Sequence, residues 1–400
     1  ILEARAGKPI KIIAVSALSK SKDRGVDLTA YEWEDDPIAL AKRDDIDVFV
    51  ELIGGESGQA KKATEEAIKH GKHVVTANKA MLAIHGQELA SAAENSGVNL
   101  RFEAAVAGGI PVIKTLTESL AGNNITRIMG VMNGTCNYIL TRMEDTGLAY
   151  EEIFEEANQL GFLEADPNLD VGGIDAAHKL VLLSSIAYGT QVDFNGAILE
   201  GIGRITIEDI KAASEMGYRI KLLGVSSLSD SGLSQTMRPC LVPLTSPLAQ
   251  LNGGTNMIII EGDAVGQIVL RGAGAGEGPT ASAVIADILD IARGINIPVF
   301  GQPANSLIKV PAISTSVENS FYLRLNLKDE AGILAKVSAA LANVGISIDR
   351  IRQEGHEKDA APVIIVTHPT DRDTLNKAIS EIEETSAAID PPVVLRIESV

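Results

Sequence analysis

The first hundred residues alternate short apolar segments with amphipathic ones, and this alternation is the strongest constraint on the fold. Residues 9–17, 46–53 and 73–77 are apolar runs typical of buried strands, whereas residues 58–70 and 79–95 have helical periodicity. Strands joined by helices imply right-handed crossovers and a parallel sheet. We therefore predict an α/β fold that begins with a Rossmann-type nucleotide-binding domain.

The N-terminus lacks part of such a domain. The chain starts with Ile-Leu-Glu-Ala-Arg-Ala-Gly-Lys, which we interpret as the tail of a helix. The strand and Gly-x-Gly-x-x-Gly turn that normally open a Rossmann unit are missing. We expect them to precede residue 1, so that the chain is truncated and its affinity for a cofactor is uncertain.

The rest of the chain suggests two further domains. Residues 106–289 are predicted to form an α+β catalytic and dimerisation domain, mainly helical at first and β-rich from 218 to 272. The chain then returns to the nucleotide-binding domain, which we place at 1–105 plus about 290–315. Residues 318–400 have the order βαββαβ, which predicts a ferredoxin-like sandwich.

Composition excludes several classes of function. A net charge of −18 argues against binding to nucleic acid and to anionic membranes. Two cysteines, Cys136 and Cys240, give no disulfide framework and suit a reducing cytoplasm. No apolar run reaches the roughly 18–20 residues that a membrane-spanning helix needs. We expect a cytoplasmic globular protein.

Residues 161–179 gather several carboxylates and one lysine around a loop that leads into a helix. The side chains that could take part in chemistry are Glu164, Asp170, Asp175 and Lys179. Asp175 and Lys179 are four residues apart, at the start of a helix too apolar for a solvated surface, and could hold a proton donor beside a small polar substrate. A surface ion pair worth a few tenths of a kcal/mol, or a helix cap, is the alternative.

This stretch resembles the signature of homoserine dehydrogenases, Gly-apolar-x-Glu-x-Asp-Pro-x-x-Asp-Val-x-Gly-x-Asp-x-x-x-Lys, and matches it throughout. The C-terminal domain resembles an ACT domain, a small-ligand sensor. Other segments resemble the same two families in the expected order: Glu-Leu-Ile-Gly-Gly at 51–55, Val-Thr-Ala-Asn-Lys at 75–79, Phe-Glu-Ala-Ala-Val-Ala-Gly-Gly-Ile-Pro at 102–111, Asn-Gly-Thr-Cys-Asn-Tyr-Ile-Leu at 133–140, Arg-Gly-Ala-Gly-Ala-Gly-Glu-Gly-Pro-Thr at 271–280, and, for the ACT domain, Asp-Glu-Ala-Gly-Ile-Leu at 329–334 and Asn-Val-Gly-Ile-Ser-Ile at 343–348.

The resemblance implies NAD(P)-dependent interconversion of L-homoserine and L-aspartate 4-semialdehyde, in threonine, isoleucine and methionine biosynthesis. We expect Lys179 to give a proton to the developing alkoxide during reduction, and to accept it in the reverse direction. Burial would lower the pKa of Lys179, while Asp175 and Asp170 would raise it. We expect Glu164 and Asp175 to hold the α-ammonium group of the substrate. The resemblance implies that Lys79 contacts cofactor and substrate; a surface lysine is the alternative.

The cofactor crevice is expected at the carboxyl ends of the parallel strands. The strand at 46–53 leads into Ile53, Gly54 and Gly55, where missing side chains let a pyrophosphate or ribose approach the backbone. An ordinary glycine loop is the alternative. The resemblance adds Gly161 and Gly276 as neighbours of the nicotinamide.

The choice between NADP and NAD depends on the loop after the first strand. Ser16-Ala17 stands where an acid would normally bind the adenosine ribose, and Lys20, Lys22 and Arg24 follow. This pattern favours the 2′-phosphate of NADP, with NAD possible. A solvated basic loop is about equally compatible with the sequence.

A monovalent cation is implied only by the resemblance. The family's sodium-type site corresponds here to the Glu103 carboxylate and the backbone carbonyls of Val106, Gly108 and Ile110, which we interpret as a structural site. Cys136 has no histidine nearby in sequence, so we interpret it as a buried apolar side chain.

Two other functions remain open: a catalytically impaired, ACT-containing regulatory paralogue, and another NADP-linked amino-acid dehydrogenase. A semialdehyde dehydrogenase should carry an activated cysteine, for which this sequence offers no setting. We expect feedback by an amino acid, threonine being favoured, near residues 332–334 and 343–346. We also expect a homodimer or homotetramer.

Overall fold

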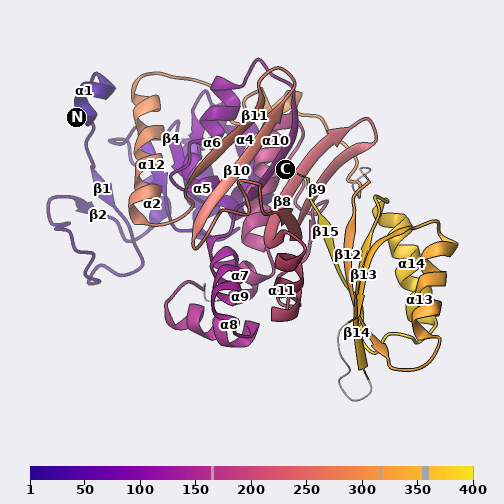
Figure 1. Cartoon of the computed structure of the whole chain (residues 1–400). Helices are drawn as coiled ribbons and strands as arrows, with labels where there is room; N and C mark the ends of the chain where they lie inside the picture. The colour runs from indigo at the N-terminus through magenta and orange to yellow at the C-terminus, as the bar shows by residue number, and fades with distance from the viewer. Residues whose placement is uncertain (164–165, 315–317, 354–359, 400) are drawn as a thin grey trace.

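A computed structural model of the chain describes residues 1–163, 166–314, 318–353 and 360–399. It has three regions, which we call the N-terminal, middle and C-terminal domains (Figure 1). The N-terminal domain contains a three-stranded parallel sheet in the order β3-β4-β5, as predicted, with helices in the crossovers. Its elements are β3 (Val48–Glu51), α3 (Gln59–Lys69), β4 (His73–Thr76), α4 (Lys79–Asn95) and β5 (Leu100–Arg101).

The prediction of a buried strand at 9–17 is wrong in extent and in burial. Only β1 (Ala14–Val15) is a strand, and it pairs with β2 (Glu32–Trp33) in a separate two-stranded sheet. Ile10 and Ile12 are 39% and 61% exposed. An extended segment becomes a buried strand only where neighbours supply hydrogen bonds and apolar cover. Within the described residues this segment has β2 alone, a neighbour of two residues.

The middle domain is built on an antiparallel sheet in the order β11-β10-β6-β8-β9. The β-rich segment at 218–272 ends in a hairpin, in which β10 pairs with β11 from Thr255 opposite Ala273 to Gly262 opposite Gly266. Helix α10 is buried along almost its whole length and packs against β8, β9 and α4. The strands are β6 (Ile125–Val131), β7 (Ile198–Leu199), β8 (Tyr218–Ser229), β9 (Gly232–Pro243), β10 (Thr255–Gly262) and β11 (Gly266–Ala273); the helices are α5 (Glu103–Ala107), α6 (Val112–Lys114), α7 (Gly134–Thr146), α8 (Tyr150–Gln159), α9 (Pro167–Val171), α10 (Ile174–Tyr188) and α11 (Ile207–Glu215).

The segment after the middle domain returns to the N-terminal domain. Helix α12 (Glu277–Ala292) contacts α5 and β4, beside which Figure 1 shows it in orange. Phe300 packs edge-on against Phe102, with ring centroids 5.7 Å apart. The carboxylate of Glu94 accepts the backbone N–H groups of Val299 and Ala304. These contacts agree with a return at 290–315, although the boundaries at 105, 289 and 318 stay predictions.

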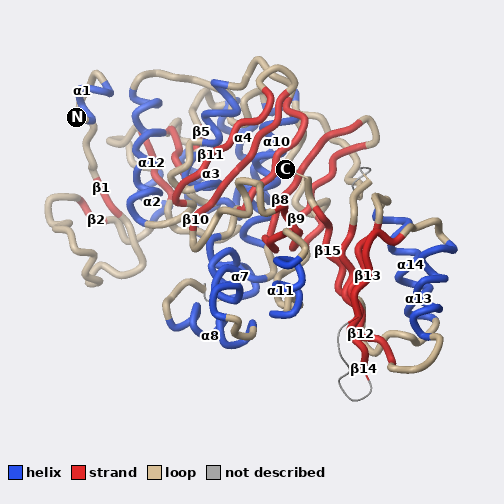
Figure 2. Tube along the Cα trace, viewed as in Figure 1, coloured by secondary structure: helices blue, strands red, loops and turns tan. Residues whose placement is uncertain are grey.

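The C-terminal domain has the predicted βαββαβ order, with the antiparallel sheet β15-β12-β14-β13 and two helices on one face. Figure 2 shows α13 and α14 side by side on the outer side of this sheet. A separate apolar core lies between sheet and helices. The elements are β12 (Phe321–Lys328), α13 (Ile333–Asn343), β13 (Ile348–Gln353), β14 (Ala360–Thr367), α14 (Arg372–Glu384) and β15 (Val393–Ile397).

The middle and C-terminal sheets are continuous, which the sequence did not indicate. Strand β15 pairs in parallel with β9, with Arg396 opposite Cys240, so that one sheet crosses both domains. A second contact lies at α11, where the fully buried Asp209 accepts hydrogen bonds from the Tyr322 hydroxyl (2.8 Å) and Arg324 Nε (2.7 Å) of β12. The C-terminal domain is therefore docked through both a strand edge and a sheet face.

Candidate active site

The start of helix α10 places a carboxylate and a lysine one turn apart. Gly173 precedes the helix with a φ of 82°, a left-handed conformation that favours glycine. Lys179 Nζ lies 2.7 Å from Asp175 Oδ2 and donates a hydrogen bond to the backbone carbonyl of Met132 at 2.8 Å. Both side chains are buried, with 8% and 7% of Lys179 and Asp175 exposed. The surface-ion-pair and helix-cap interpretations of this pair are therefore wrong.

A second lysine reaches the same carboxylate from the N-terminal domain. Lys79 is the first residue of α4, directly after β4, and its Nζ lies 2.9 Å from Asp175 Oδ1. Asn78 fixes this position, because its side chain caps α4 at Met81 N and donates to the carbonyl of Gly55 at 2.8 Å. Asp175 thus joins lysines of two domains.

The ionisation of Asp175 follows from this arrangement. Burial alone would raise the pKa of Asp175, but the charges of Lys179 and Lys79 outweigh burial and hold that pKa well below its usual range. Asn133 supports the carboxylates, since its Nδ2 donates to Asp170 Oδ1 at 2.9 Å and to Asp175 Oδ2 at 3.3 Å. Asp170 is 4% exposed. The acids and the two lysines form one polar cluster, which is buried except at Lys79, whose side chain is 29% exposed.

The loop after β3 borders this cluster. Glu51, which is fully buried at the end of β3, accepts the backbone N–H groups of Ile53 (2.7 Å) and Gly54 (3.0 Å). Gly54 and Gly55 have φ values of 84° and 85°, and a Cβ atom at either would meet only open space. Leu52 and Ile53 are 60% and 53% exposed. A glycine loop with exposed apolar side chains at the carboxyl end of a parallel strand fits a dinucleotide.

The three cations predicted to favour NADP lie in the loop between β1 and β2. Lys20 Nζ and Arg24 Cζ lie 5.8 and 5.7 Å from the ring centroid of Trp33, and Arg24 also donates to the carbonyls of Ser19 and Lys22. No contact within the described residues joins these cations to the loop after β3. The structure therefore brings Lys20 and Arg24 to one aromatic face rather than to the lysine–aspartate cluster.

The two glycines assigned to the nicotinamide lie in two different loops, one after α8 and one before α12. Gly161 follows α8 with a φ of 74°, and the next carbonyl, of Phe162, accepts the hydroxyl of Thr135 at 2.9 Å in the first turn of α7. Gly276 precedes α12, two residues after Gly274, which packs against Asn256. Asn256 donates to the Met132 carbonyl that also accepts from Lys179.

Glu103 is buried at the crossover between the first two domains. Its two carboxylate oxygens accept the backbone N–H groups of Ile113 and Lys114, both at 2.9 Å, and burial raises its pKa to about 7. Within the described residues no group of three or more His, Cys, Asp or Glu side chains could hold a metal ion. Carbonyl-rich sodium sites need no such group. Gly108, with a φ of 55°, packs so closely on Gly274 that a Cβ atom would lie 2.6 Å from its carbonyl.

Cys136 is fully buried and its thiol donates to the carbonyl of Asp170 at 3.2 Å. Burial, reinforced by the charges of Asp170 and Asp175, raises its pKa well above the usual value, so the thiol stays protonated. His178, next to Lys179, is buried against the ring of Phe194, and burial lowers its pKa.

One predicted site residue, Glu164, lies outside the described residues. Three residues that support the cluster were missed as site residues: Glu51, Asn78 and Asn133. Each stands in a segment that resembles the homoserine dehydrogenase pattern, and Asn133 precedes a helix as a capping residue should. The position of Asn133 just before a helix was the signal in the sequence that could have identified it.

A parallel-sheet domain with a glycine loop, joined to an α+β domain that carries a buried lysine–aspartate pair, defines a nicotinamide-dependent dehydrogenase, here with a C-terminal βαββαβ domain. Family models agree domain by domain: "Homoserine dehydrogenase, NAD binding domain" matches residues 1–103, "Homoserine dehydrogenase" matches 111–289 and "ACT domain" matches 321–386. The chain belongs to the homoserine dehydrogenase family and is an NAD(P)-dependent oxidoreductase.

Individual relatives span the whole chain. A homoserine dehydrogenase of Neisseria gonorrhoeae is 42% identical over 100% of this chain and 93% of its own length, and one of Pseudomonas aeruginosa is 41% identical over 99% and 93%. The crystal structure of a homoserine dehydrogenase from Thiobacillus denitrificans matches with a TM-score of 0.93 and 39% identity, covering 100% of this chain and 92% of that one. None of the helices in the described parts of the chain is long and apolar enough to cross a membrane.

Proposed function

We propose that the chain interconverts L-homoserine and L-aspartate 4-semialdehyde with Lys179 as the proton donor and acceptor. Bound NADPH would supply the hydride. Two of the three Nζ protons of Lys179 go to Asp175 and to the Met132 carbonyl, which leaves one donor for the substrate oxygen. As the aldehyde is reduced, this proton and the positive charge stabilise the developing alkoxide.

The observation that carries the proposal is that Asp175 pairs with both Lys179 and Lys79 beside the glycine loop after β3. Because Asp175 joins lysines of both domains, this arrangement supports a substrate whose reacting carbonyl group lies between the N-terminal and middle domains. The buried carboxylate of Asp175 also suits the α-ammonium of an amino acid, a role that we assign to it together with Glu164 and with Asp170 as a further acid.

Turnover tests the proposal directly. Purified chain should reduce NADP in the presence of L-homoserine, followed as absorbance of the reduced nicotinamide. D-homoserine and L-serine should give little signal, because a correctly placed ammonium and a hydroxyl two carbons from Cα are both required. Binding of L-homoserine with no turnover, at any cofactor concentration, would favour the regulatory paralogue; turnover of another amino acid in preference to L-homoserine would favour a different dehydrogenase.

For the cofactor we favour NADP over NAD. The cations on Trp33 support this choice, and a hyperthermophilic archaeal homoserine dehydrogenase solved in complex with NADPH matches 66% of this chain at 28% identity. Replacing Lys20 and Arg24 by Gln should weaken NADPH about tenfold or more and leave NADH nearly unchanged, since a charge-assisted hydrogen bond contributes about 1.5–3 kcal/mol. Lys69→Gln, at the exposed end of α3, is the control. Equal losses for both cofactors would contradict the assignment.

We also propose that Na⁺ binds at Glu103 and the carbonyls of Val106, Gly108 and Ile110. The buried carboxylate and the tight turn at Gly108 support an oxygen-rich cation site. Na⁺ should raise the thermal unfolding temperature more than tetramethylammonium at equal ionic strength, and Glu103→Gln should abolish the difference. The same response to both cations would contradict the site.

We propose threonine as an effector of the C-terminal domain. A pocket at the turn between β12 and α13 is lined by Gly332, Ile333 and Leu334 but not by residues 343–346, which supports an effector site at this turn. Deleting the domain is a poor test, because it would expose the edge of β9. Ala335→Arg, which fills the pocket, should abolish threonine inhibition, whereas Ala342→Arg, on an exposed position of the same helix, should not. Inhibition that survives Ala335→Arg would place the effector elsewhere.

We further expect a homodimer or homotetramer in the cytoplasm. The edge strand β11, with Val269 40% exposed, supports association through the middle domain. Light scattering of Val269→Glu should show a smaller assembly than the unchanged chain.

A further inference from the structure

Three arginines of three different elements converge where the C-terminal domain joins the middle domain. Arg396 of β15 stands opposite Cys240 of β9 in one strand pair and opposite Phe321 of β12 in the other. Arg238 precedes Cys240 by two residues, so both side chains lie on the same face of β9. Arg372, the first residue of α14, has its guanidinium 5.8 Å from the ring centroid of Phe321. We call these residues, Arg238, Arg372 and Arg396, the arginine cluster.

Two members of the arginine cluster, Arg238 and Arg372, lack the partners that guanidinium groups removed from water require. Arg238 and Arg396 are 9% and 4% exposed, yet the Nε of each has no hydrogen bond. Within the described residues, Arg238 and Arg372 have neither a side-chain hydrogen bond nor an ion pair. Arginine side chains are rarely this buried unless they are paired, because an uncompensated charge is costly to remove from water.

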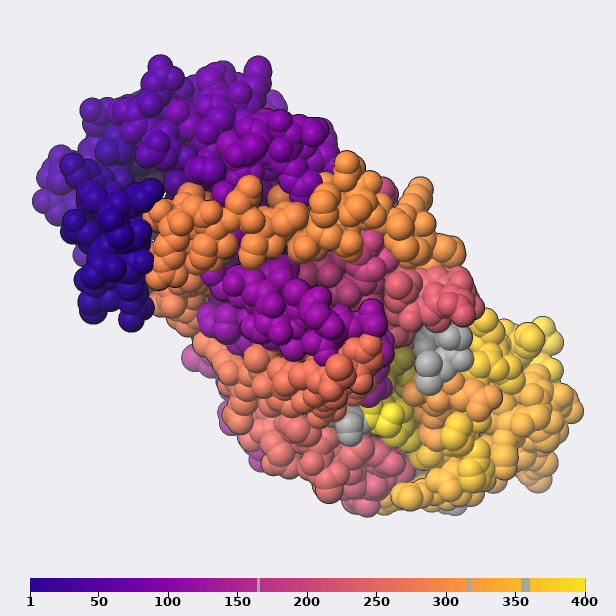
Figure 3. All heavy atoms as spheres, turned by 90° about the horizontal axis from the view of Figure 1, so that it is seen from above, coloured from indigo at the N-terminus to yellow at the C-terminus, as the bar shows by residue number. Residues whose placement is uncertain are grey.

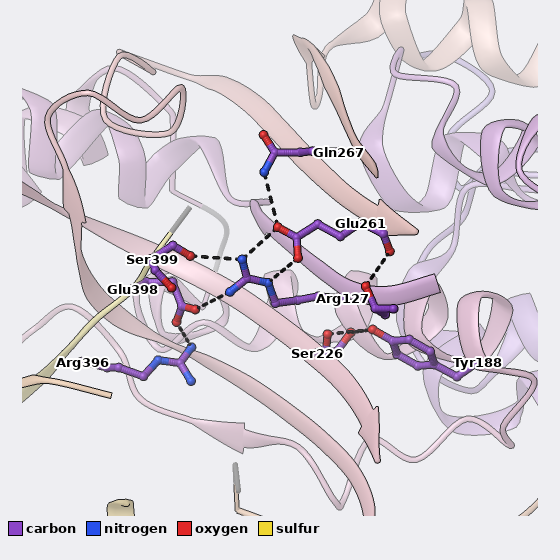
Figure 4. Close-up of polar contacts among 9 residues, drawn as sticks. Arg127, Tyr188, Ser226, Glu261, Gln267, Arg396, Glu398 and Ser399 are labelled. Atoms are coloured by element: carbon purple, nitrogen blue, oxygen red, sulfur yellow. Dashed lines mark hydrogen bonds and ion pairs between the residues drawn. The ribbon is translucent and has the colours of Figure 1, made fainter. Parts of the chain in front are cut away.

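Two of the nearby carboxylates, Glu398 and Glu261, are already engaged with Arg396 and Arg127. Glu398 lies 2.5 Å from Arg396 Nη2 and 3.0 Å from Arg127 Nη1, so that one carboxylate serves two cations (Figure 4). Arg127 is held further by both oxygens of Glu261. This network of Arg127, Glu261, Arg396 and Glu398 is neutral. Arg238 and Arg372 share one further carboxylate, Glu200, whose charge acts on both, so their surroundings keep an excess of one positive charge in a chain whose net charge is −18.

The charges around the cluster affect the pKa values of its arginines. Burial lowers the pKa of both Arg238 and Arg372, and the charge of Arg396 lowers each of them further, whereas the charge of Glu200 raises both. Figure 3 shows the yellow of the last strand at the floor of a hollow between the middle and C-terminal domains.

We propose that the arginine cluster is a binding site for a small molecule that carries a carboxylate or phosphate group, inserted between the middle and C-terminal domains. The guanidinium groups of Arg238 and Arg372 supply bidentate donors, and the N-terminus of α14, a helix of 13 residues, adds a favourable dipole. Because its donors come from both domains, the anion would stabilise their docked arrangement. The site is separate from the lysine–aspartate cluster and from the pocket at Gly332.

Calorimetric titration of the full chain with inorganic phosphate, and separately with succinate, tests the site in a buffer of low ionic strength. Arg372→Gln and Arg238→Met should each weaken the better-bound anion by about tenfold to a hundredfold, since each removes a charge-assisted contact. Arg350→Gln, on an exposed position of β13, removes the same charge elsewhere and should bind as the unchanged chain does. Preference for phosphate or for succinate would identify which group the natural ligand carries.

Unfolding temperatures without added anion separate this role from a structural one. Arg238→Met should unfold at the same or a higher temperature, because an unpaired buried charge has been removed, whereas an arginine that only supports the fold would leave a less stable variant. The proposal is overturned if the unchanged chain binds neither anion. It is overturned too if all variants, Arg350→Gln included, lose the same affinity for the anion, because general screening of charge by salt would give that result. It is also overturned if Arg238→Met separates subunits without changing anion binding.

Discussion

Replacing Lys179 by Met removes the ammonium and keeps the length and much of the bulk of the side chain. A lost general acid lowers turnover by about 10²–10⁴-fold, and a lost donor to a developing oxyanion by about 10²–10³-fold. Because one group performs both tasks here, the two losses are not additive. We expect kcat to fall by at least about 10³-fold, or roughly 4 kcal/mol of transition-state stabilisation.

The fold should survive this substitution. Asp175 keeps its ion pair with Lys79 and its hydrogen bond from Asn133, so the carboxylate is not left alone in the interior. We expect a loss of about 1–3 kcal/mol in the free energy of unfolding, below the cost of a fully orphaned buried charge. Urea denaturation of the variant beside the unchanged chain measures this loss.

Lys221 provides a matched control. It is 2% exposed, its Nζ donates to Asn137 Oδ1 and to the carbonyl of Leu251, and burial lowers its pKa to about 8. Lys221→Met should therefore lose comparable stability while kcat changes only a few-fold. The reasoning is refuted if Lys179→Met retains kcat within tenfold, or if both variants lose activity in proportion to stability.

Three further predictions use other parts of the structure. Asn133→Ala should lower kcat about tenfold to a hundredfold with KM for cofactor unchanged, measured by steady-state kinetics, because the acids of the site lose a shared donor. Burial raises the pKa of Glu103 to about 7, so its ionisation opposes folding as the pH rises from about 4.5 to 7. In Na⁺-free urea denaturations, the free energy of unfolding of Glu103→Gln should therefore rise by up to about 3 kcal/mol relative to that of the unchanged chain across this pH range. A difference in stability that does not change with pH would contradict this. Arg324→Met should destabilise the docked C-terminal domain by about 3–5 kcal/mol, because the buried carboxylate of Asp209 loses its ion-pair partner; calorimetry should show an earlier transition.

Local patterns in the sequence were sufficient for most elements. Apolar periodicity located α4 and the strands of the C-terminal domain, and Gly161 and Gly173 marked where helices end and begin. These features depend on neighbours along the chain. The segment at 9–17 was misjudged because its burial depends on strands beside it, which an apolar run cannot report.

Long-range contacts could not be read from the sequence in this way. The pairing of β9 with β15 joins residues about 150 positions apart, and neither strand carries a mark of its neighbour. The pairing of Lys79 with Asp175 likewise depends on how two domains meet. Resemblance to the family placed both residues at a site, but only the fold shows that they share one carboxylate.

The arrangement of a ternary complex is the most direct test of the central claim. A crystal structure of the chain with oxidised cofactor and L-homoserine should place the substrate hydroxyl within about 3 Å of Lys179 Nζ, with Asp175 still bound to that lysine. A substrate hydroxyl oriented away from Lys179, with another side chain as its hydrogen-bond partner, would contradict the account.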